Sequence, residues 1–156
     1  FRVSGRVVTM PYEEGDSVPE GVLVASLDKQ PYADEVLRAQ AVLESARLTL
    51  ANTELLLKRR ERLVKEGGVS REDYENALSA RNVDFANFKQ AEANLGVALT
   101  NLQDTEIFSP SGGVILTRIR EPGSVVLTSE PVYTLSLISP VWVRAFVSET
   151  DLGRIY

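Results

Sequence analysis

One stretch decides the fold: KRRERLVKEGGVSREDY, residues 58–74. Gly67 and Gly68 can take the positive φ that ends a helix. Ser70, with Asp73 three residues later, resembles a capping box that begins a new helix, with Asp in place of Glu. Basic residues crowd before the glycines and acidic residues follow them, so each set complements the dipole of its own helix. The stretch therefore predicts the turn of an antiparallel helical hairpin.

Heptad-like spacing extends from this turn in both directions. The middle of the chain, about residues 31–104, has no proline after Pro31 and is rich in Ala, Leu, Glu, Arg and Asn. Before the turn, the positions at alternating steps of three and four are Val36, Ala39, Leu43, Ala46, Leu50, Thr53, Leu57, Arg60 and Val64. After the turn, they are Tyr74, Leu78, Arg81, Phe85, Phe88, Glu92, Leu95, Leu99 and Leu102. This period is typical of helices that pack along one stripe, as in coiled coils, although two arginines and a glutamate interrupt it.

The chain on either side of the hairpin is predicted to form β-structure, and the two flanking blocks resemble each other. The blocks 1–28 and about 107–150 hold most of the Gly and Pro and many β-branched residues. At an offset of 108 residues, and at 110 for the last pair, Gly15 matches Gly123, Val18 matches Val126 and Leu27 matches Leu137. Neither block is long enough to bury a core alone, so we expect two half-barrels that close on each other. The first helical arm, residues 31–66, would extend about 54 Å and must project from them.

Composition excludes several kinds of chemistry. The 156 residues contain no His and no Cys, which excludes zinc sites built on these residues, Cys nucleophiles, Ser-His-Asp relays and disulfides. A net charge of −5 argues against a nucleic-acid binder. No apolar run approaches the roughly 18 residues that span a bilayer. We expect the chain to be a fragment cut at both ends, with any export signal or anchor upstream of it.

The two half-motifs carry a family resemblance. Glu14-Gly15-Asp16-Ser17-Val18 and Ser109-Pro110-Ser111-Gly112-Gly113-Val114, placed around a hairpin, resemble the split biotinyl/lipoyl domain of the membrane fusion proteins related to haemolysin secretion protein D. The resemblance implies an α+β fold: a long antiparallel coiled-coil hairpin inserted in a split biotinyl/lipoyl-like β-sandwich, or barrel-sandwich hybrid. The implied divisions are half-motif 1 at 1–28, the hairpin at 29–106, half-motif 2 at 107–139 and the truncated start of a β-barrel domain at 140–156.

The tip of the hairpin carries a more specific match. Adaptors of this family that dock onto outer-membrane channels of the TolC type have an Arg, a Leu four residues later and a Ser seven beyond that, and Arg59, Leu63 and Ser70 stand at these spacings. The resemblance implies that these three side chains dock onto the channel, beside the turn at Gly67 and Gly68. Singly, Leu63 also fits a core position, Ser70 an N-cap and Arg59 a solvated charge.

What the resemblance implies for function is a non-catalytic periplasmic adaptor without a cofactor. Such a subunit bridges an inner-membrane transporter of the ABC or RND type to a channel of the TolC type in a Gram-negative bacterium. It works as a homo-oligomer, a trimer or a hexamer, and does not bind nucleic acid. The full-length protein is expected to be periplasmic and anchored to the inner membrane.

Three other interpretations use particular residues. A structural coiled coil that dimerises through its seam would explain the heptad spacing, but it would not explain the flanking half-barrels. Lys29, in an Asp-Lys pair, stands where lipoyl domains carry their modified lysine, but Pro31 and a helix follow it at once. The acidic residues near one turn would be candidates for acid/base catalysis, although acidic turns are usually just solvated; they are Glu13, Glu14, Asp16 and Glu20.

Overall fold

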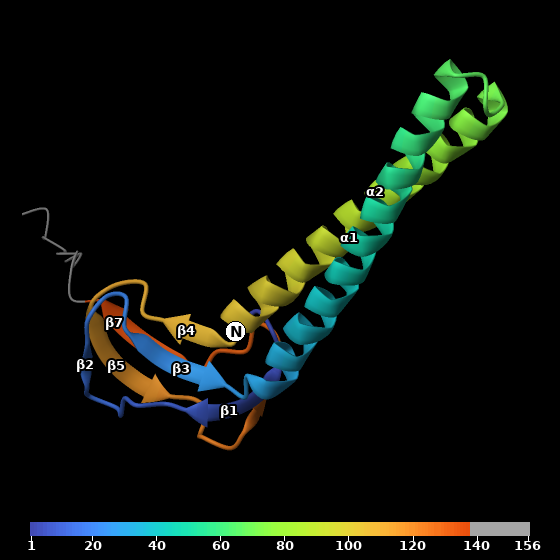
Figure 1. The fold of residues 1–156 in the computed structure, drawn as a ribbon. Helices are drawn as coiled ribbons and strands as arrows, with labels where there is room; N and C mark the ends of the chain where they lie inside the picture. Colours follow the sequence, from blue (N-terminus) through green and yellow to red (C-terminus); the bar gives the residue numbers. More distant parts are fainter. Residues whose placement is uncertain (138–156) are drawn as a thin grey trace, which may run out of the picture.

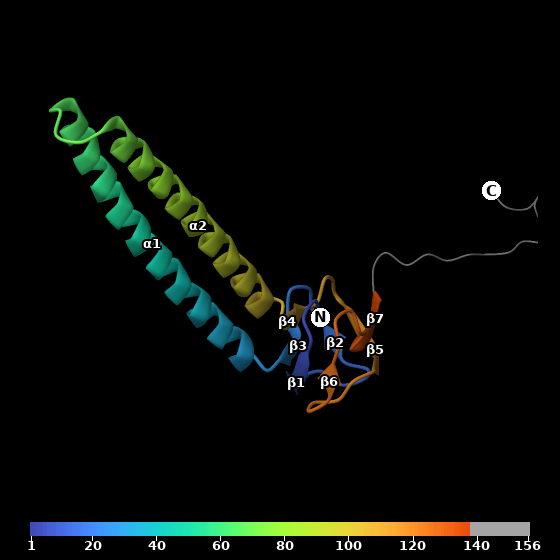
Figure 2. The ribbon, with the colours of Figure 1, turned by 90° about the vertical axis from the view of Figure 1, so that its right-hand side faces the viewer.

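The computed structural model describes residues 1–137. A long helical hairpin projects from a small β-domain, and the two helices run side by side from base to tip (Figures 1 and 2). This arrangement confirms the predicted fold class. The expected start of a β-barrel domain, residues 140–156, lies outside the described residues.

Two helices and seven strands make up this part of the chain. In order they are β1 (Gly5–Thr9), β2 (Ser17–Val18), β3 (Leu23–Leu27), α1 (Gln30–Lys65), α2 (Arg71–Gln103), β4 (Glu106–Phe108), β5 (Gly113–Arg118), β6 (Val125–Val126) and β7 (Tyr133–Leu137). The predicted repeat holds strand by strand, because β1, β2 and β3 correspond to β5, β6 and β7.

The two halves of the repeat exchange their middle strands. One sheet has the order β4-β3-β1-β6 and the other the order β2-β5-β7, with antiparallel pairing throughout. The short strand β2 therefore completes the sheet of the second half, and β6 completes the sheet of the first. The two halves close on each other as the sequence predicted, and neither sheet exists without the other half.

Apolar residues from both halves form the core of the β-domain. Val7 packs in one buried cluster with Val126, and Val18 packs in the other with Ile115. All four are at most 2% exposed. Burying a side chain of this size contributes about 1.5–3 kcal/mol, so these contacts across the halves drive the strand exchange.

Two equivalent glycine turns stabilise the exchange of strands between the halves. Gly15 and Gly123 have φ of +92° and +91°, a conformation that side chains rarely adopt. The N–H of Gly15 donates to the carbonyl of Ile115 in the other half, and the N–H of Gly123 donates to the carbonyl of Val7, both at 2.8 Å. The glycines that matched in the sequence therefore form equivalent turns, each with a hydrogen bond to the other half.

The hairpin is joined to the β-domain by short, tightly bonded links. Two residues connect β3 to α1, and two connect α2 to β4. Thr105 in the second link is fully buried, and its carbonyl accepts from the N–H of Leu27 at 2.8 Å. An ion pair of 2.5 Å between Lys29 in the first link and Glu106 in β4 also joins the two arms at the base. Since β3 and β4 also pair directly, both helices leave the β-domain from one ladder.

The seam of α1 is the predicted one. All nine predicted positions, from Val36 to Val64, are buried or half-buried, whereas their neighbours on the outer side are exposed. Arg60 lies in this seam and is half-buried, as its heptad position requires.

The predicted seam of α2 is wrong at every second position. Leu78, Phe85 and Leu99 are 37%, 40% and 47% exposed, and Glu92 is also exposed. The helix instead turns the preceding residues toward α1: Ala77, Asp84, Ala91 and Ala98. Tyr74, Arg81, Phe88, Leu95 and Leu102 keep their predicted seam positions. Because small side chains allow two helices to approach closely, the larger residues remain at the edge of the interface.

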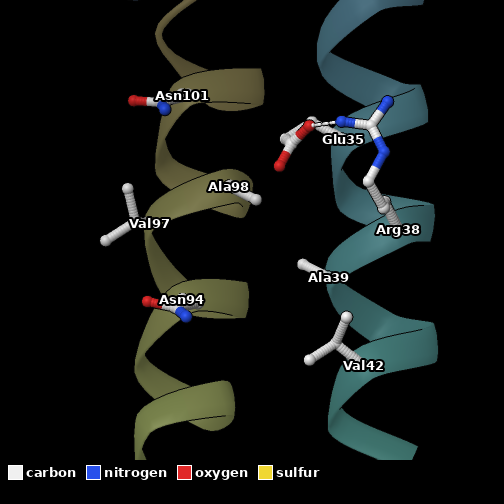
Figure 3. A pocket seen from close by; sticks show the side chains of 8 residues that line it. All are labelled: Glu35, Arg38, Ala39, Val42, Asn94, Val97, Ala98 and Asn101. Atoms are coloured by element: carbon white, nitrogen blue, oxygen red, sulfur yellow. Dashed lines mark hydrogen bonds and ion pairs between the residues drawn. The ribbon is translucent and has the colours of Figure 1, made fainter.

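Small seam residues leave a shallow groove along one side of the hairpin near its base. Figure 3 shows Ala39 of α1 and Ala98 of α2 pointing toward one another between the helices. The groove has a volume of about 330 Å³ and is lined by Glu35, Arg38, Ala39, Val42, Asn94, Val97, Ala98 and Asn101. Within residues 1–137, neither helix has a stretch apolar enough to cross a bilayer.

Removing the hairpin tests whether the β-domain folds independently of it. We expect a chain in which residues 30–103 are replaced by Asn-Gly to keep a folded β-domain, because β3 and β4 already pair at the junction. Far-ultraviolet circular dichroism should lose its helical signal, while dispersed amide resonances in NMR spectra remain. Loss of the chemical-shift dispersion of the amide resonances would show that the hairpin is needed to close the β-domain.

Candidate docking site at the tip of the hairpin

The turn at the tip is closed by backbone hydrogen bonds at the end of α1. Gly67 has φ of +72°, and its N–H donates to the carbonyl of Val64 at 3.1 Å. The N–H of Gly68 donates to the carbonyl of Leu63 at 2.8 Å. Only Gly67 of the two adopts a positive φ. The chain thus reverses within five residues and presents the last turn of α1 at the end of the molecule.

Ser70 begins α2 as its N-cap. Its hydroxyl accepts from the N–H of Asp73 at 3.1 Å, and the Asp73 carboxylate accepts from the N–H of Ser70 at 3.2 Å. The Ser70 hydroxyl also donates to this carboxylate at 2.8 Å. These contacts are the capping box that the sequence predicted, and they hold the hydroxyl to the helix end.

The capping box makes the stability of the hairpin depend on pH. The Ser70 hydroxyl and N–H donate to the Asp73 carboxylate and hold its pKa below the usual value, and Arg60 acts in the same direction. The charged box therefore stabilises the hairpin above the pKa of an unfolded Asp, about 3.9. This stabilisation is lost as the pH falls through the lower pKa of the folded state.

Asp73→Asn tests this dependence. Between pH 5 and pH 2 we expect the wild-type hairpin to lose more thermal stability than the variant, because only the wild type has the carboxylate to protonate. The measurement is thermal unfolding followed by circular dichroism at 222 nm. Both proteins contain the same other carboxylates, so equal losses would show that the box adds no pH dependence.

The structure places Arg59 and Leu63 one turn apart on the same side of α1. Arg59 is exposed and forms no ion pair with any of residues 1–137. Leu63 is half-buried, and a Cβ added at Gly68 would meet one of its methyl groups at 3.6 Å. Ser70 is exposed across the turn, with its hydroxyl engaged in the capping box. The three predicted docking residues thus lie together at the tip, two on α1 and one at the start of α2.

An ion pair in the middle of the hairpin was not predicted from the sequence. Arg81 of α2 binds Glu54 of α1 at 3.1 Å, and its guanidinium lies 4.8 Å from the centre of the Phe85 ring. The arginine that interrupts the seam is therefore paired across it. Glu54 stands 13 residues before Gly67 and Arg81 stands 13 residues after Gly68, and equal distances from the turn place two residues at the same height in an antiparallel hairpin. This equality is the signal from which the sequence could have predicted the pair.

Lys29 lies at the base of the hairpin, directly before the first turn of α1. Its ammonium group pairs with Glu106, so the lysine links the two arms. A lysine that carries a lipoyl group needs an exposed turn between two strands, and the hairpin occupies that place. The geometry gives Lys29 a structural contact instead.

Two of the acidic residues near the first turn, Glu13 and Glu14, contact an arginine of β5. The Arg118 guanidinium binds Glu13 at 3.0 Å and Glu121 at 2.7 Å, and its backbone N–H donates to Glu14 at 3.0 Å. Asp16 accepts from the backbone N–H of Glu13 at 2.8 Å. These carboxylates therefore hold the turn against the second half of the β-domain. The arrangement favours a structural role for them over acid/base catalysis.

A comparison with protein families matches the hairpin. Residues 34–105 match the model described as the α-helical hairpin domain of RND membrane fusion proteins. The match begins near the base of α1 and ends just after α2, so it covers the projecting arm and its tip.

Curated relatives match over almost the whole chain. A UPF0194 membrane protein of Yersinia enterocolitica is 35% identical over 99% of this chain, and one of Citrobacter koseri is 30% identical. The chain spans 63% and 62% of the lengths of these two relatives.

Solved structures share the fold. MacA from Actinobacillus actinomycetemcomitans has a TM-score of 0.77 over 98% of this chain and 52% of its own, at 23% identity. ZneB from Cupriavidus metallidurans has a TM-score of 0.65 over 100% of this chain and 66% of its own, at 21% identity. A putative efflux transporter from Bacteroides eggerthii has a TM-score of 0.64 over 89% of this chain and 38% of its own, at 27% identity.

Proposed function

We propose that the chain belongs to the membrane fusion proteins, the family of periplasmic adaptors, and that it connects an inner-membrane transporter to an outer-membrane channel; the match of residues 34–105 to the hairpin domain of RND membrane fusion proteins supports this proposal. The role is binding rather than catalysis. The hairpin reaches the channel, and the β-domain side of the molecule faces the transporter.

One observation carries this proposal: a long arm that contacts nothing of the described β-domain beyond its base (Figure 1). Such an arm contributes little to the core of the β-domain, so its length is explained by what it reaches. Its end is closed by a defined turn and presents Arg59, which forms no ion pair with any of residues 1–137, beside the half-buried Leu63. A leucine can fill a groove between partner helices while an arginine reaches polar groups at its rim.

We further propose that Arg59, Leu63 and Ser70 dock onto a channel of the TolC type. The transporter is of the RND or ABC class, and the match to an RND-type hairpin favours the first. The full-length protein is periplasmic and anchored to the inner membrane, in keeping with relatives that are named membrane proteins. Three or six copies form the working assembly.

Photocrosslinking from the tip tests the channel contact. In the full-length protein, a photoreactive amino acid at Glu66 should capture the outer-membrane channel, because Glu66 is exposed beside the turn. The same amino acid at Val8, which is 53% exposed on the β-domain, is the matched control and should not capture it. Capture from Glu66 of nothing but a second copy of the protein would favour the coiled-coil scaffold and contradict the adaptor role.

A further inference from the structure

The positive charges of the hairpin that lack an ion pair within residues 1–137 lie in one short stretch of α1. Outside this stretch, every Lys and Arg of the two helices binds a carboxylate; these residues are Arg38, Arg47, Lys65, Arg71, Arg81 and Lys89. The stretch itself contains Lys58, Arg59, Arg60 and Arg62, and none of them forms an ion pair with another residue of the described chain. Positive charge that is not balanced within the hairpin is therefore concentrated near the tip.

Three of these cations are exposed on one side of α1. Lys58, Arg59 and Arg62 are exposed, whereas Arg60 is half-buried in the seam. Arg62 stands three residues after Arg59 and four after Lys58, so these three side chains are neighbours on the helix surface. Together they are called the basic patch below. Arg60 lowers the pKa of the Asp73 carboxyl on α2, so its charge acts across the seam and not on the exposed side.

The stability of the helix does not explain the basic patch. A cation complements the helix dipole only within the last turn, and the basic residues in the last turn of α1 are Arg62 and Lys65. Lys58 and Arg59 lie before that turn. Like charges three or four residues apart also destabilise a helix. The basic patch therefore lowers the stability of the free hairpin, and a partner of opposite charge would offset this cost.

Two leucines flank the basic patch. Leu55, which is 63% exposed, stands three residues before Lys58 and four before Arg59, and Leu63 stands four after Arg59. Charges around apolar side chains are typical of a binding surface, where the apolar groups are buried and the charges lie at the rim. The chain carries a net charge of −5, so the patch is a local reversal of sign. The surface that fits it has carboxylates around an apolar groove.

We propose that the basic patch binds carboxylates on the outer-membrane channel, beside the groove that receives Leu63. The inference rests on the proposed function for the identity of the partner and adds the chemistry of the partner's surface. Attraction between opposite charges extends about 8 Å at physiological ionic strength, so it acts before the surfaces touch. It raises the rate of association and orients the tip toward its site. Lys58 and Arg62 thus guide the docking of Leu63.

A carbodiimide, which joins a lysine amine to a carboxylate in direct contact with it, tests the contact at Lys58. Membranes that contain the full-length protein and the channel are treated, and crosslinked peptides are identified by mass spectrometry. We expect Lys58 to be linked to an Asp or Glu of the channel. Lys89 is the control in the same protein: its side chain is 56% exposed on α2 and pairs with Glu92, so it should give no link to the channel.

Charge reversal at Lys58 tests the guidance. Lys58→Glu removes one cation and places a carboxylate four residues before Arg62, a spacing at which the two pair and stabilise the helix. We expect capture of the channel by the photoreactive group at Glu66 to fall roughly fivefold or more, with no loss of helical signal in circular dichroism. Capture by the wild type should itself fall several-fold between roughly 0.05 M and 0.5 M salt, and capture by the variant should change little.

Arg47→Glu is the matched control for this reversal. Arg47 is exposed on the same side of α1, eleven residues before Lys58, or about 16 Å at 1.5 Å per residue. The change in net charge is the same, but the site lies beyond the range of about 8 Å over which charges act at physiological ionic strength. Capture from Glu66 should therefore stay at the wild-type level. An equal fall with both variants would show an effect of net charge and contradict a role of the basic patch.

Three further outcomes contradict the inference. A link from Lys58 to a carboxylate of a second copy, and none to the channel, would assign the patch to contacts between copies. Loss of capture by Lys58→Glu without any link from Lys58 to a carboxylate would show that the patch binds another anion, such as a lipid phosphate. Capture that depends neither on salt nor on the charge at Lys58 would show that docking needs no guidance.

These results separate the basic patch from the adaptor role. If Glu66 captures the channel while Lys58 gives no link to it and Lys58→Glu has no effect, the adaptor role stands and the acidic partner surface is wrong. If Glu66 captures no channel at any salt concentration, the proposed function fails, and the assignment of the patch fails with it.

Discussion

Replacing Leu63 with Asp should abolish export by the full-length protein while leaving its fold intact. Leu63 lies in the last turn of α1 and is half-buried, and its carbonyl accepts from the N–H of Gly68 at 2.8 Å. Few contacts within the hairpin are lost, so we expect a cost of about 1 kcal/mol to its stability. In the docked state the same carboxylate would be removed from water without a partner, which costs several kcal/mol and reduces binding by about a hundredfold or more.

Leu56→Asp is the matched control for this result. Leu56 is 39% exposed and lies two turns below Leu63 on the same side of α1, about 10 Å away at 1.5 Å per residue. It should lower stability to a similar extent and leave export unchanged. The measurements are export in a strain that lacks the wild-type gene and circular dichroism of the purified proteins. Normal export by Leu63→Asp, or equal loss with both variants, would contradict docking through Leu63.

Replacing Gly113 with Ala should be the most destabilising single-methyl change in the β-domain. A Cβ at Gly113 would lie 2.5 Å from the carbonyl oxygen of Ser136 and 2.8 Å from a side-chain carbon of Leu135. The oxygen belongs to β7, which pairs with β5, so it cannot withdraw without opening the ladder. We expect a loss of about 3 kcal/mol in the free energy of unfolding.

The repeat supplies the control for Gly113. Gly5 occupies the equivalent position in the first half, but a Cβ there would meet a methyl group of Leu27 at 3.2 Å. A side chain can rotate away, so Gly5→Ala should cost about 1 kcal/mol or less. Urea unfolding of both variants measures the difference. Equal costs would show that the sheet yields at Gly113 as easily as a side chain does.

The repeat and the hairpin turn were predictable because their signals are local or periodic. The glycine turns at Gly15 and Gly123 need a backbone conformation that few residues adopt, so the matched glycines marked equivalent turns. The capping box spans only Ser70 to Asp73, and its geometry follows from four consecutive residues. The exchange of β2 and β6 between the sheets was expected only as closure of two halves, because partner strands are chosen by contacts distant in sequence.

The error in α2 has a physical origin. Leu78, Phe85 and Leu99 have the greater apolar area, so a reading of apolar periodicity places them in the seam. Burial of Ala77, Ala91 and Ala98 in the seam stabilises the hairpin more, because their small side chains let the two helices approach closely along their whole length. The docking residues at the tip remain a prediction, since a docking surface is defined by a partner and not by the fold of the chain.

The short links at the base of the hairpin make it a lever. Both arms leave one β-ladder through two-residue links, with Thr105 buried and Lys29 bound to Glu106. A helix of 36 residues is about 54 Å long, so a tilt of about 5° at this fulcrum sweeps the tip through about 5 Å. A displacement of that size equals one helical turn. Small rotations of the β-domain would therefore displace the tip far enough to change which turn of a partner helix it contacts.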